Sequence, residues 1–112
     1  MSAITTHVLD TSTGRPATGV PVTLEKQAGG GWQNAGQGIT NQDGRITDLL
    51  AGAELVPGTY RLIFDTAAYF SGRKQPSFYP QVQVMFTVSA AGQHYHVPLL
   101  LSPFGYSTYR GS

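Results

Sequence analysis

The chain has 112 residues, the usual size of one domain that buries a hydrophobic core of its own. Its net charge is +1, and its seven lysine and arginine residues are scattered from Arg15 to Arg110. This distribution lacks the basic stripe that nucleic-acid binding requires, and no apolar run approaches the roughly 20 residues of a membrane span. Cysteine is absent, which excludes a disulfide framework and a thiolate nucleophile.

Charged residues make up only 12% of the chain, about half the average for soluble domains. A surface so poor in charge hints that other subunits cover part of it. Met1 is followed by Ser-Ala-Ile-Thr-Thr-His, without the basic and apolar regions of a signal peptide. We therefore expect a cytoplasmic protein with a single domain over residues 1–112.

Apolar and polar residues alternate in several short stretches, and no long stretch has the 3.6-residue period of an amphipathic helix. Tyr60, Leu62 and Phe64, for example, alternate with more polar neighbours. Such alternation is typical of strands with one buried face, and turn signals such as Asp43-Gly44 separate the stretches. The expected strands lie near residues 3–10, 19–27, 31–39, 45–50, 58–66, 81–88 and 93–101, with a last short one near 105–109. Many short strands at this spacing predict an all-β sandwich or barrel.

One stretch between the strands predicts a short helix. Residues 66–71, Thr-Ala-Ala-Tyr-Phe-Ser, follow Asp65. Pro76 and Pro80 then favour an extended loop, because proline cannot continue a helix.

The three histidines of the chain fall on outward positions of predicted strands. His94 and His96 are two residues apart, so a strand directs both to one face. The opposite face carries Tyr95, Val97, Leu99 and Leu101. In the first strand, Ile4 and Val8 mark the core face and His7 the other one. The pattern thus predicts three imidazoles on the outer faces of the sandwich.

These histidines allow three interpretations. In the first, they are solvated surface residues. In the second, a pair of them acts as general base and general acid in a hydrolysis, since imidazole titrates near neutral pH. In the third, all three form an open zinc site. The spacing alone does not separate these alternatives. There is no Gly-x-Ser-x-Gly motif and no cysteine, so water is the expected nucleophile of any hydrolysis.

Two further features bear on a site. Arg45 follows the Asp43-Gly44 turn; it is either solvated, or paired with Asp43 or Asp48, or it binds a carbonyl-rich ligand and lowers the pKa of a neighbouring histidine. The carboxyl-terminal segment from Ser102 to Ser112 is rich in aromatic residues, whereas terminal residues are normally polar and frayed. We expect this segment to dock against the domain.

Several motifs, in order along the whole chain, resemble the transthyretin-related proteins, specifically their 5-hydroxyisourate hydrolase branch. The carboxyl-terminal Tyr-Arg-Gly-Ser resembles the signature tetrapeptide of that branch, which transthyretin itself lacks. The other motifs are Thr6-His7-Val8-Leu9-Asp10 with Gly14-Arg15-Pro16-Ala17, then Tyr79-Pro80, and last His94-Tyr95-His96-Val97-Pro98-Leu99-Leu100-Leu101-Ser102-Pro103.

The resemblance implies a transthyretin-like (prealbumin-like) β-sandwich of seven to eight strands with one short helix. It implies a homotetramer, a dimer of dimers, with sites in the groove between the dimers. The implied activity is hydrolysis of 5-hydroxyisourate to 2-oxo-4-hydroxy-4-carboxy-5-ureidoimidazoline in urate breakdown, without metal or cofactor. A transthyretin-like carrier of a small ligand, without catalysis, is the alternative.

The resemblance also assigns roles to residues of this chain. The expected catalytic residues are His7, Arg45, His96 and Ser112. The expected substrate contacts come from His7 and Arg45 again, together with Tyr109, Arg110 and Gly111. His94 shares a strand with His96 but does not match the catalytic histidine of the family.

Overall fold

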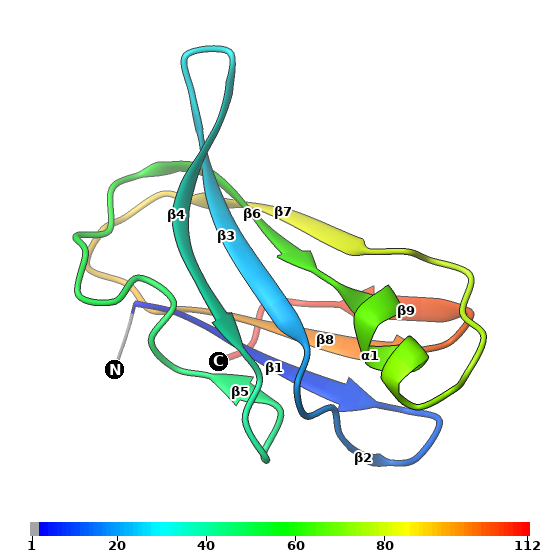
Figure 1. Cartoon of the computed structure of the whole chain (residues 1–112). Coiled ribbons are helices and arrows are strands. Elements are labelled where there is room, and N and C mark those ends of the chain that lie inside the picture. Colours follow the sequence, from blue (N-terminus) through cyan, green and yellow to red (C-terminus); the bar gives the residue numbers. More distant parts are fainter. Residues whose placement is uncertain (1–2) are drawn as a thin grey trace.

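The computed structural model describes residues 3–112, which form two β-sheets and one short helix (Figure 1). The strands are β1 (Ile4–Asp10), β2 (Arg15–Pro16), β3 (Pro21–Ala28), β4 (Gly31–Ile39), β5 (Arg45–Ile46), β6 (Gly58–Phe64), β7 (Val82–Val88), β8 (Tyr95–Ser102) and β9 (Gly105–Thr108). The helix α1 spans Thr66–Gly72. The predicted all-β sandwich with one short helix is confirmed, although residues 3–112 form nine strands where seven to eight were expected.

The two sheets differ in how their strands connect. One has the order β2-β1-β8-β9, with β5 also pairing with β1, and the other has the order β4-β3-β6-β7. We call them the first and the second sheet. In the first sheet β1 and β8 run parallel, although about 90 residues of chain separate them. The first sheet thereby brings both ends of the sequence together in one layer (Figure 1).

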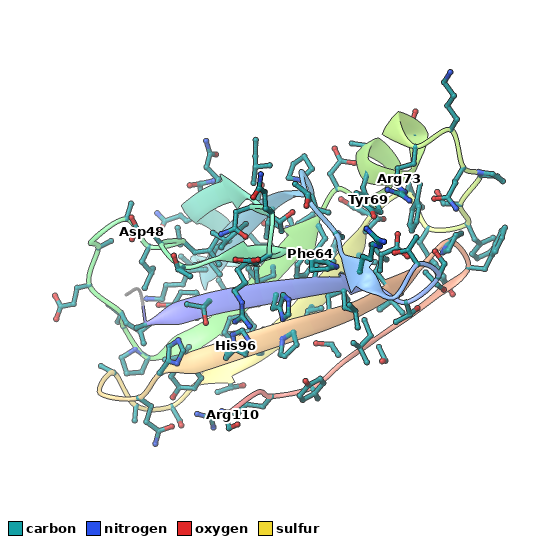
Figure 2. The ribbon with its side chains drawn as sticks, turned by 90° about the horizontal axis from the view of Figure 1, so that it is seen from below. Asp48, Phe64, Tyr69, Arg73, His96 and Arg110 are labelled. Atoms are coloured by element: carbon teal, nitrogen blue, oxygen red, sulfur yellow. The ribbon has the colours of Figure 1, made fainter. Side chains whose placement is uncertain are left out.

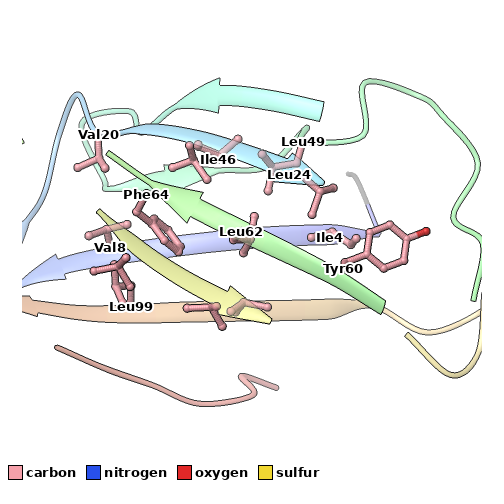
Figure 3. Packing of buried hydrophobic residues seen from close by; sticks show 14 of the residues in the cluster. Ile4, Val8, Val20, Leu24, Ile46, Leu49, Tyr60, Leu62, Phe64 and Leu99 are labelled. Atoms are coloured by element: carbon pink, nitrogen blue, oxygen red, sulfur yellow. The ribbon is translucent and has the colours of Figure 1, made fainter. Parts of the chain in front are cut away.

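The hydrophobic core lies between the sheets and follows the alternation seen in the sequence. Leu24, Leu62 and Phe64 of the second sheet are fully buried, and Val8 and Leu99 of the first sheet lie opposite them (Figure 3). Burial of a large aliphatic or aromatic side chain contributes about 1.5–3 kcal/mol each. The face of the first sheet that points away from this core is thus free to carry polar side chains.

The helix begins and ends close to its predicted bounds. The carboxylate of Asp65 accepts a hydrogen bond from the backbone N–H of Ala68 at 3.1 Å, which satisfies one of the unpaired donors at the helix start. Tyr69 and Phe70 are buried and hold the helix against the end of the sandwich. No helix of the described residues is long and apolar enough to cross a membrane.

A buried carboxylate ties this helix to β1. Asp10 has no exposed surface, and its side chain accepts hydrogen bonds from the Tyr69 hydroxyl at 2.7 Å and from the Ser12 hydroxyl at 2.6 Å. Burial acts to raise the pKa of Asp10, but these hydrogen bonds outweigh it and leave the pKa below its ordinary value. Burial and the bond to Asp10 raise the pKa of Tyr69 to about 12.

The variant Tyr69→Phe tests this tie. It leaves one oxygen of Asp10 buried without its partner, so we expect the free energy of unfolding in urea to fall by about 1–3 kcal/mol at pH 7. Because the folded-state pKa of Asp10 is lowered, its stabilisation is present above the ordinary carboxyl range and is lost as the pH falls through the lowered value. The difference between the two proteins should therefore shrink in acid. Tyr106→Phe, in an exposed residue of β9, is the control, and equal effects of the two variants would contradict the assignment.

Two sequence-based strand assignments were wrong in part. Residues 45–50 were expected to form a strand, but only Arg45 and Ile46 do so. Leu49 and Leu50 are both buried, which a strand with one buried face does not allow for neighbours. The loop packs so closely on β4 that a Cβ on Gly36 would lie 1.8 Å from the carbonyl oxygen of Leu49. Conversely, Arg15 and Pro16 pair with β1 as β2, where no strand was expected.

Candidate functional site on the outer face of the first sheet

Four neighbouring segments bring the site residues together. His7 of β1 pairs with Arg45 of β5, and Thr5 of β1 pairs with His96 of β8. On the far side of β8, the backbone N–H of Gly111 donates to the carbonyl oxygen of His96 at 2.8 Å. The segments therefore lie side by side in the order β5, β1, β8 and the carboxyl-terminal segment. The outer face of this sheet is seen in Figure 2, where His96 lies over β8.

The outward orientation that the sequence predicted for the histidines is confirmed. Tyr95, Val97, Leu99 and Leu101 are buried on the core side of β8, whereas His94 is exposed and His96 is half-buried. In β1, Ile4 and Val8 are fully buried and His7 is half-buried.

A tight turn sets Arg45 against β1. The side-chain oxygen of Asn41 accepts hydrogen bonds from the backbone N–H groups of Asp43 at 2.9 Å and Arg45 at 3.0 Å. Gly44 has a φ of 74°, and a Cβ there would lie 2.4 Å from the carbonyl oxygen of Val8, so only glycine fits. Among residues 3–112 the ion pair formed is that of Arg61 with Glu25, and Arg45 pairs with neither Asp43 nor Asp48.

A hollow of about 170 Å³ opens on the outer face of the first sheet. It is lined by Thr5, Thr6, Arg45, Thr47, His94, His96 and Ser112. The pKa of His96 is lowered, first by burial and then by the charge of Arg45, with His94 and His7 acting in the same direction. A hydrogen bond with the backbone of Thr5 opposes this shift. His96 is therefore a neutral imidazole at pH 7, able to accept a proton, next to a guanidinium.

The carboxyl-terminal tetrapeptide divides between two places. Ser112 lines the hollow and Gly111 pairs with the backbone of His96, as predicted for a docked end. Arg110 instead lies with its guanidinium carbon 4.6 Å from the centre of the Tyr95 ring and donates to the side chain of Gln93 at 2.9 Å. Together with Tyr109 it lines a second hollow, of about 320 Å³, against β7. His96 also lines this second hollow, but Tyr109 and Arg110 do not line the first one, where His94, His96 and Arg45 meet.

Sequence reasoning missed one residue of the site, Thr5. Its hydroxyl lies 3.0 Å from Nε2 of His94 and 2.8 Å from Nδ1 of His96. The signal was present, because Thr5 and His7 are two apart and share the outward face of β1. Threonine is so common in strands, however, that its presence did not indicate a polar role.

The comparisons with known proteins identify the family. The model of the HIUase/Transthyretin family matches residues 4–111. The chain belongs to this family. A relative from Salmonella typhimurium, named 5-hydroxyisourate hydrolase, is 50% identical over 109 residues, which cover 97% of this chain and 80% of the relative.

Two solved structures from this family show that the fold alone does not distinguish a hydrolase from a carrier. The 5-hydroxyisourate hydrolase of Klebsiella pneumoniae is 38% identical, with a TM-score of 0.86 over 97% of this chain and 92% of that one. Sea bream transthyretin in complex with thyroxine is 32% identical, with a TM-score of 0.92 over 98% of this chain and 95% of that one. Since both structures share the sandwich, the side chains on its outer face must distinguish a hydrolase from a carrier.

Proposed function

We propose that the protein hydrolyses 5-hydroxyisourate to 2-oxo-4-hydroxy-4-carboxy-5-ureidoimidazoline in urate degradation. The observation that carries the proposal is a neutral His96 beside Arg45 at a hollow on the outer face of the first sheet. A carrier groove for an apolar ligand needs no such polar cluster. We infer the identity of the substrate from the relatives that bear the name 5-hydroxyisourate hydrolase.

The reaction opens a ring amide by the addition of water. In our proposal, Nε2 of His96 takes a proton from the attacking water, and the water oxygen bonds to the ring carbonyl carbon. Arg45 stabilises the negative charge that develops on the carbonyl oxygen. The ring C–N bond then breaks, the nitrogen receives a proton from His96 or His7, and the carbonyl carbon becomes a carboxylate. Ser112 holds the substrate or the water at the edge of the hollow.

The proposed chemistry uses no metal. Among the described residues, no group of three or more histidine and acidic side chains is placed to hold a metal ion. The rings of His94 and His96 instead meet at the hydroxyl of Thr5. Activity that survives exhaustive chelation is the expected result, and its loss with recovery on adding Zn²⁺ would favour the zinc alternative.

The proposed assembly is a homotetramer, a dimer of dimers, in the cytoplasm. The hollow lies open on a sheet face, and the low charge of the chain fits a surface covered by other subunits. A second dimer seated on this face would exclude water from the hollow and strengthen the charges inside it. It also offers a way for Tyr109 and Arg110 of one subunit to serve the site of another.

An ultraviolet time course tests the function directly. Urate is oxidised by urate oxidase, with and without this protein, and the decay of the 5-hydroxyisourate signal is followed. The proposal expects decay much faster than the spontaneous reaction and proportional to protein concentration. Binding of freshly made 5-hydroxyisourate without faster decay would favour the carrier alternative, which rests on the likeness to a transthyretin that holds thyroxine.

The variant Arg45→Gln probes the charge beside His96. Arg45 lowers the pKa of His96, so its removal should raise that pKa. Because the base must be neutral to act, the acidic limb of the kcat profile should move to higher pH. The plateau rate should also fall by about 10²–10³-fold if the guanidinium stabilises the oxyanion.

Two companion variants keep this result interpretable. Arg45→Lys retains a charge and should leave the acidic limb close to that of the wild-type protein. Arg15→Gln removes an exposed charge in β2, outside the residues that line the hollow, and should change neither limb nor plateau. An acidic limb that does not move in Arg45→Gln would show that the charge of Arg45 does not lower the pKa of the base.

A further inference from the structure

His96 is held at both edges of its ring by residues that the proposed mechanism does not use. At one edge, Nδ1 lies 2.8 Å from the hydroxyl of Thr5, a residue only 4% exposed. At the other edge, a Cβ on Gly111 would lie 2.5 Å from Cδ2 and 3.2 Å from Cγ of the ring. Gly111 thus leaves no room for a side chain. The ring is confined between β1 and the carboxyl-terminal segment, and Nε2 is the nitrogen that neither neighbour occupies.

The Thr5 hydroxyl faces two imidazoles with a single proton to donate. It lies 3.0 Å from Nε2 of His94 as well, and the two rings stack with centres 6.3 Å apart. If both contacts are hydrogen bonds and both rings are neutral, a hydroxyl that donates to one of these nitrogens must accept a hydrogen bond from the other. The tautomers of His94 and His96 are therefore coupled through Thr5.

The surroundings favour one of the two coupled arrangements. The charged and titratable groups that act on His96 are Arg45 on β5, His7 on β1 and His94 before β8, and all three oppose a second proton on its ring. A neutral imidazole carries one N–H. The backbone of Thr5 also forms a hydrogen bond that favours the protonated form of His96, as an accepting group does. An acceptor favours a proton on the ring nitrogen that faces it, and Nδ1 is the nitrogen of His96 that lies 2.8 Å from the Thr5 hydroxyl.

We propose that Thr5 and Gly111 are positioning residues for His96: the Thr5 hydroxyl keeps the ring proton on Nδ1, and Gly111 fixes the plane of the ring. The lone pair of Nε2 then faces the hollow, in the state required to take a proton from water. The Thr5 hydroxyl in turn donates to Nε2 of His94, so that His94 supports the arrangement without touching substrate. This inference rests on the proposed function, in which His96 is the base.

Imidazole ¹⁵N spectra and steady-state kinetics test the inference together, on the full chain. The spectra report which ring nitrogen carries the proton and need no substrate; the chain has only three histidines, so single-histidine variants assign them. In the wild-type protein we expect His96 in the Nδ1–H form. Thr5→Val keeps the shape of the side chain and should give a mixture of tautomers.

The same substitution should lower kcat by about tenfold, the rate equivalent of one hydrogen bond, with KM little changed because Thr5 is buried. Thr5→Ser should restore both the tautomer and kcat. Gly111→Ala should lower kcat and shift the His96 signals, because the ring must turn away from the new Cβ. Thr23→Val, on β3 of the second sheet, is the matched control and should leave both readouts unchanged.

An Nε2–H form of His96 in the wild-type protein would overturn the inference, and so would wild-type tautomer and kcat in Thr5→Val. Loss of kcat in Thr5→Ser as large as in Thr5→Val would also overturn it, because shape rather than the hydroxyl would then matter. Failure of the proposed function looks different. It would appear as no turnover by the wild-type protein, while the ¹⁵N spectra would still decide the tautomer.

Discussion

Replacing His96 with alanine is expected to lower kcat by about 10²–10⁴-fold, or about 3–5 kcal/mol of barrier, the usual contribution of a general base. The reason lies in the environment of its ring, where burial and Arg45 lower the pKa and so keep the base neutral at pH 7. The sandwich should persist, because the ring lies on the outer face of the first sheet and is no part of the core. Ultraviolet assays of turnover across pH 5–9 measure the change in kcat, with circular dichroism as a check of folding.

The other two histidines are the matched controls for this experiment. His94→Ala should lose much less activity, because His94 contacts the base through the Thr5 hydroxyl and by ring stacking but transfers no proton in the proposed reaction. His7→Ala should lose activity but keep an acidic limb, since His96 remains to titrate. If the acidic limb disappears in His7→Ala and persists in His96→Ala, then His7 is the base and our assignment is wrong.

The face on which each side chain lies was predictable, whereas the neighbours of each strand were not. Alternation placed Val97 and Leu99 inside and His96 outside, because a strand has a side-chain period of two. The same alternation is silent about which strand lies beside which. The parallel pairing that sets Thr5 next to His96 joins residues 91 apart in sequence, and it follows from the packing of two sheets.

Close contacts between a glycine and another part of the chain were the second feature that the sequence did not predict. Nothing in the pattern around Gly36 or Gly111 indicated that another part of the chain would press on them, since a glycine also serves turns and flexible ends. The resemblance to the family carried Gly111 into the site as a substrate contact. The geometry adds a second feature, because the missing side chain of Gly111 makes room for the His96 ring.

The carboxyl-terminal segment shows both what was and what was not predictable. Its aromatic content indicated a docked end, and residues 105–108 do form β9. Beyond Thr108 the segment has no alternation from which to derive the direction of a side chain. The resemblance grouped Tyr109 and Arg110 with the histidines; in one chain Arg110 stacks on Tyr95, and both residues line the hollow against β7 that His96 also lines.

Deletion of residues 109–112 is expected to abolish measurable turnover, a loss of at least about 10²-fold, because it removes two supports of the base at once. The backbone pairing of Gly111 with His96 is lost, and Ser112 no longer closes the hollow. The sandwich should stay folded, because β9 remains paired with β8 and the Thr108 hydroxyl still donates to the carbonyl oxygen of Pro98 at 2.7 Å. Loss of the Arg110–Tyr95 stacking should cost only about 0.5–1 kcal/mol of unfolding free energy. Normal turnover by the folded truncation would show that the tetrapeptide has no part in the reaction.

Mixed assemblies separate what the tetrapeptide does within its own chain from what it does for another. Gly111 orients His96 of the same chain, so mixing the truncated protein with His96→Ala should restore little activity. Arg110 stacks on Tyr95 of its own chain, and we propose that in the tetramer it serves the site of a neighbour. Mixing Arg110→Ala with His96→Ala should then restore a fraction of the turnover, because some assemblies combine an intact His96 with an intact Arg110. No recovery in that mixture, with mixed tetramers demonstrated by native mass spectrometry, would confine the whole site to a single chain.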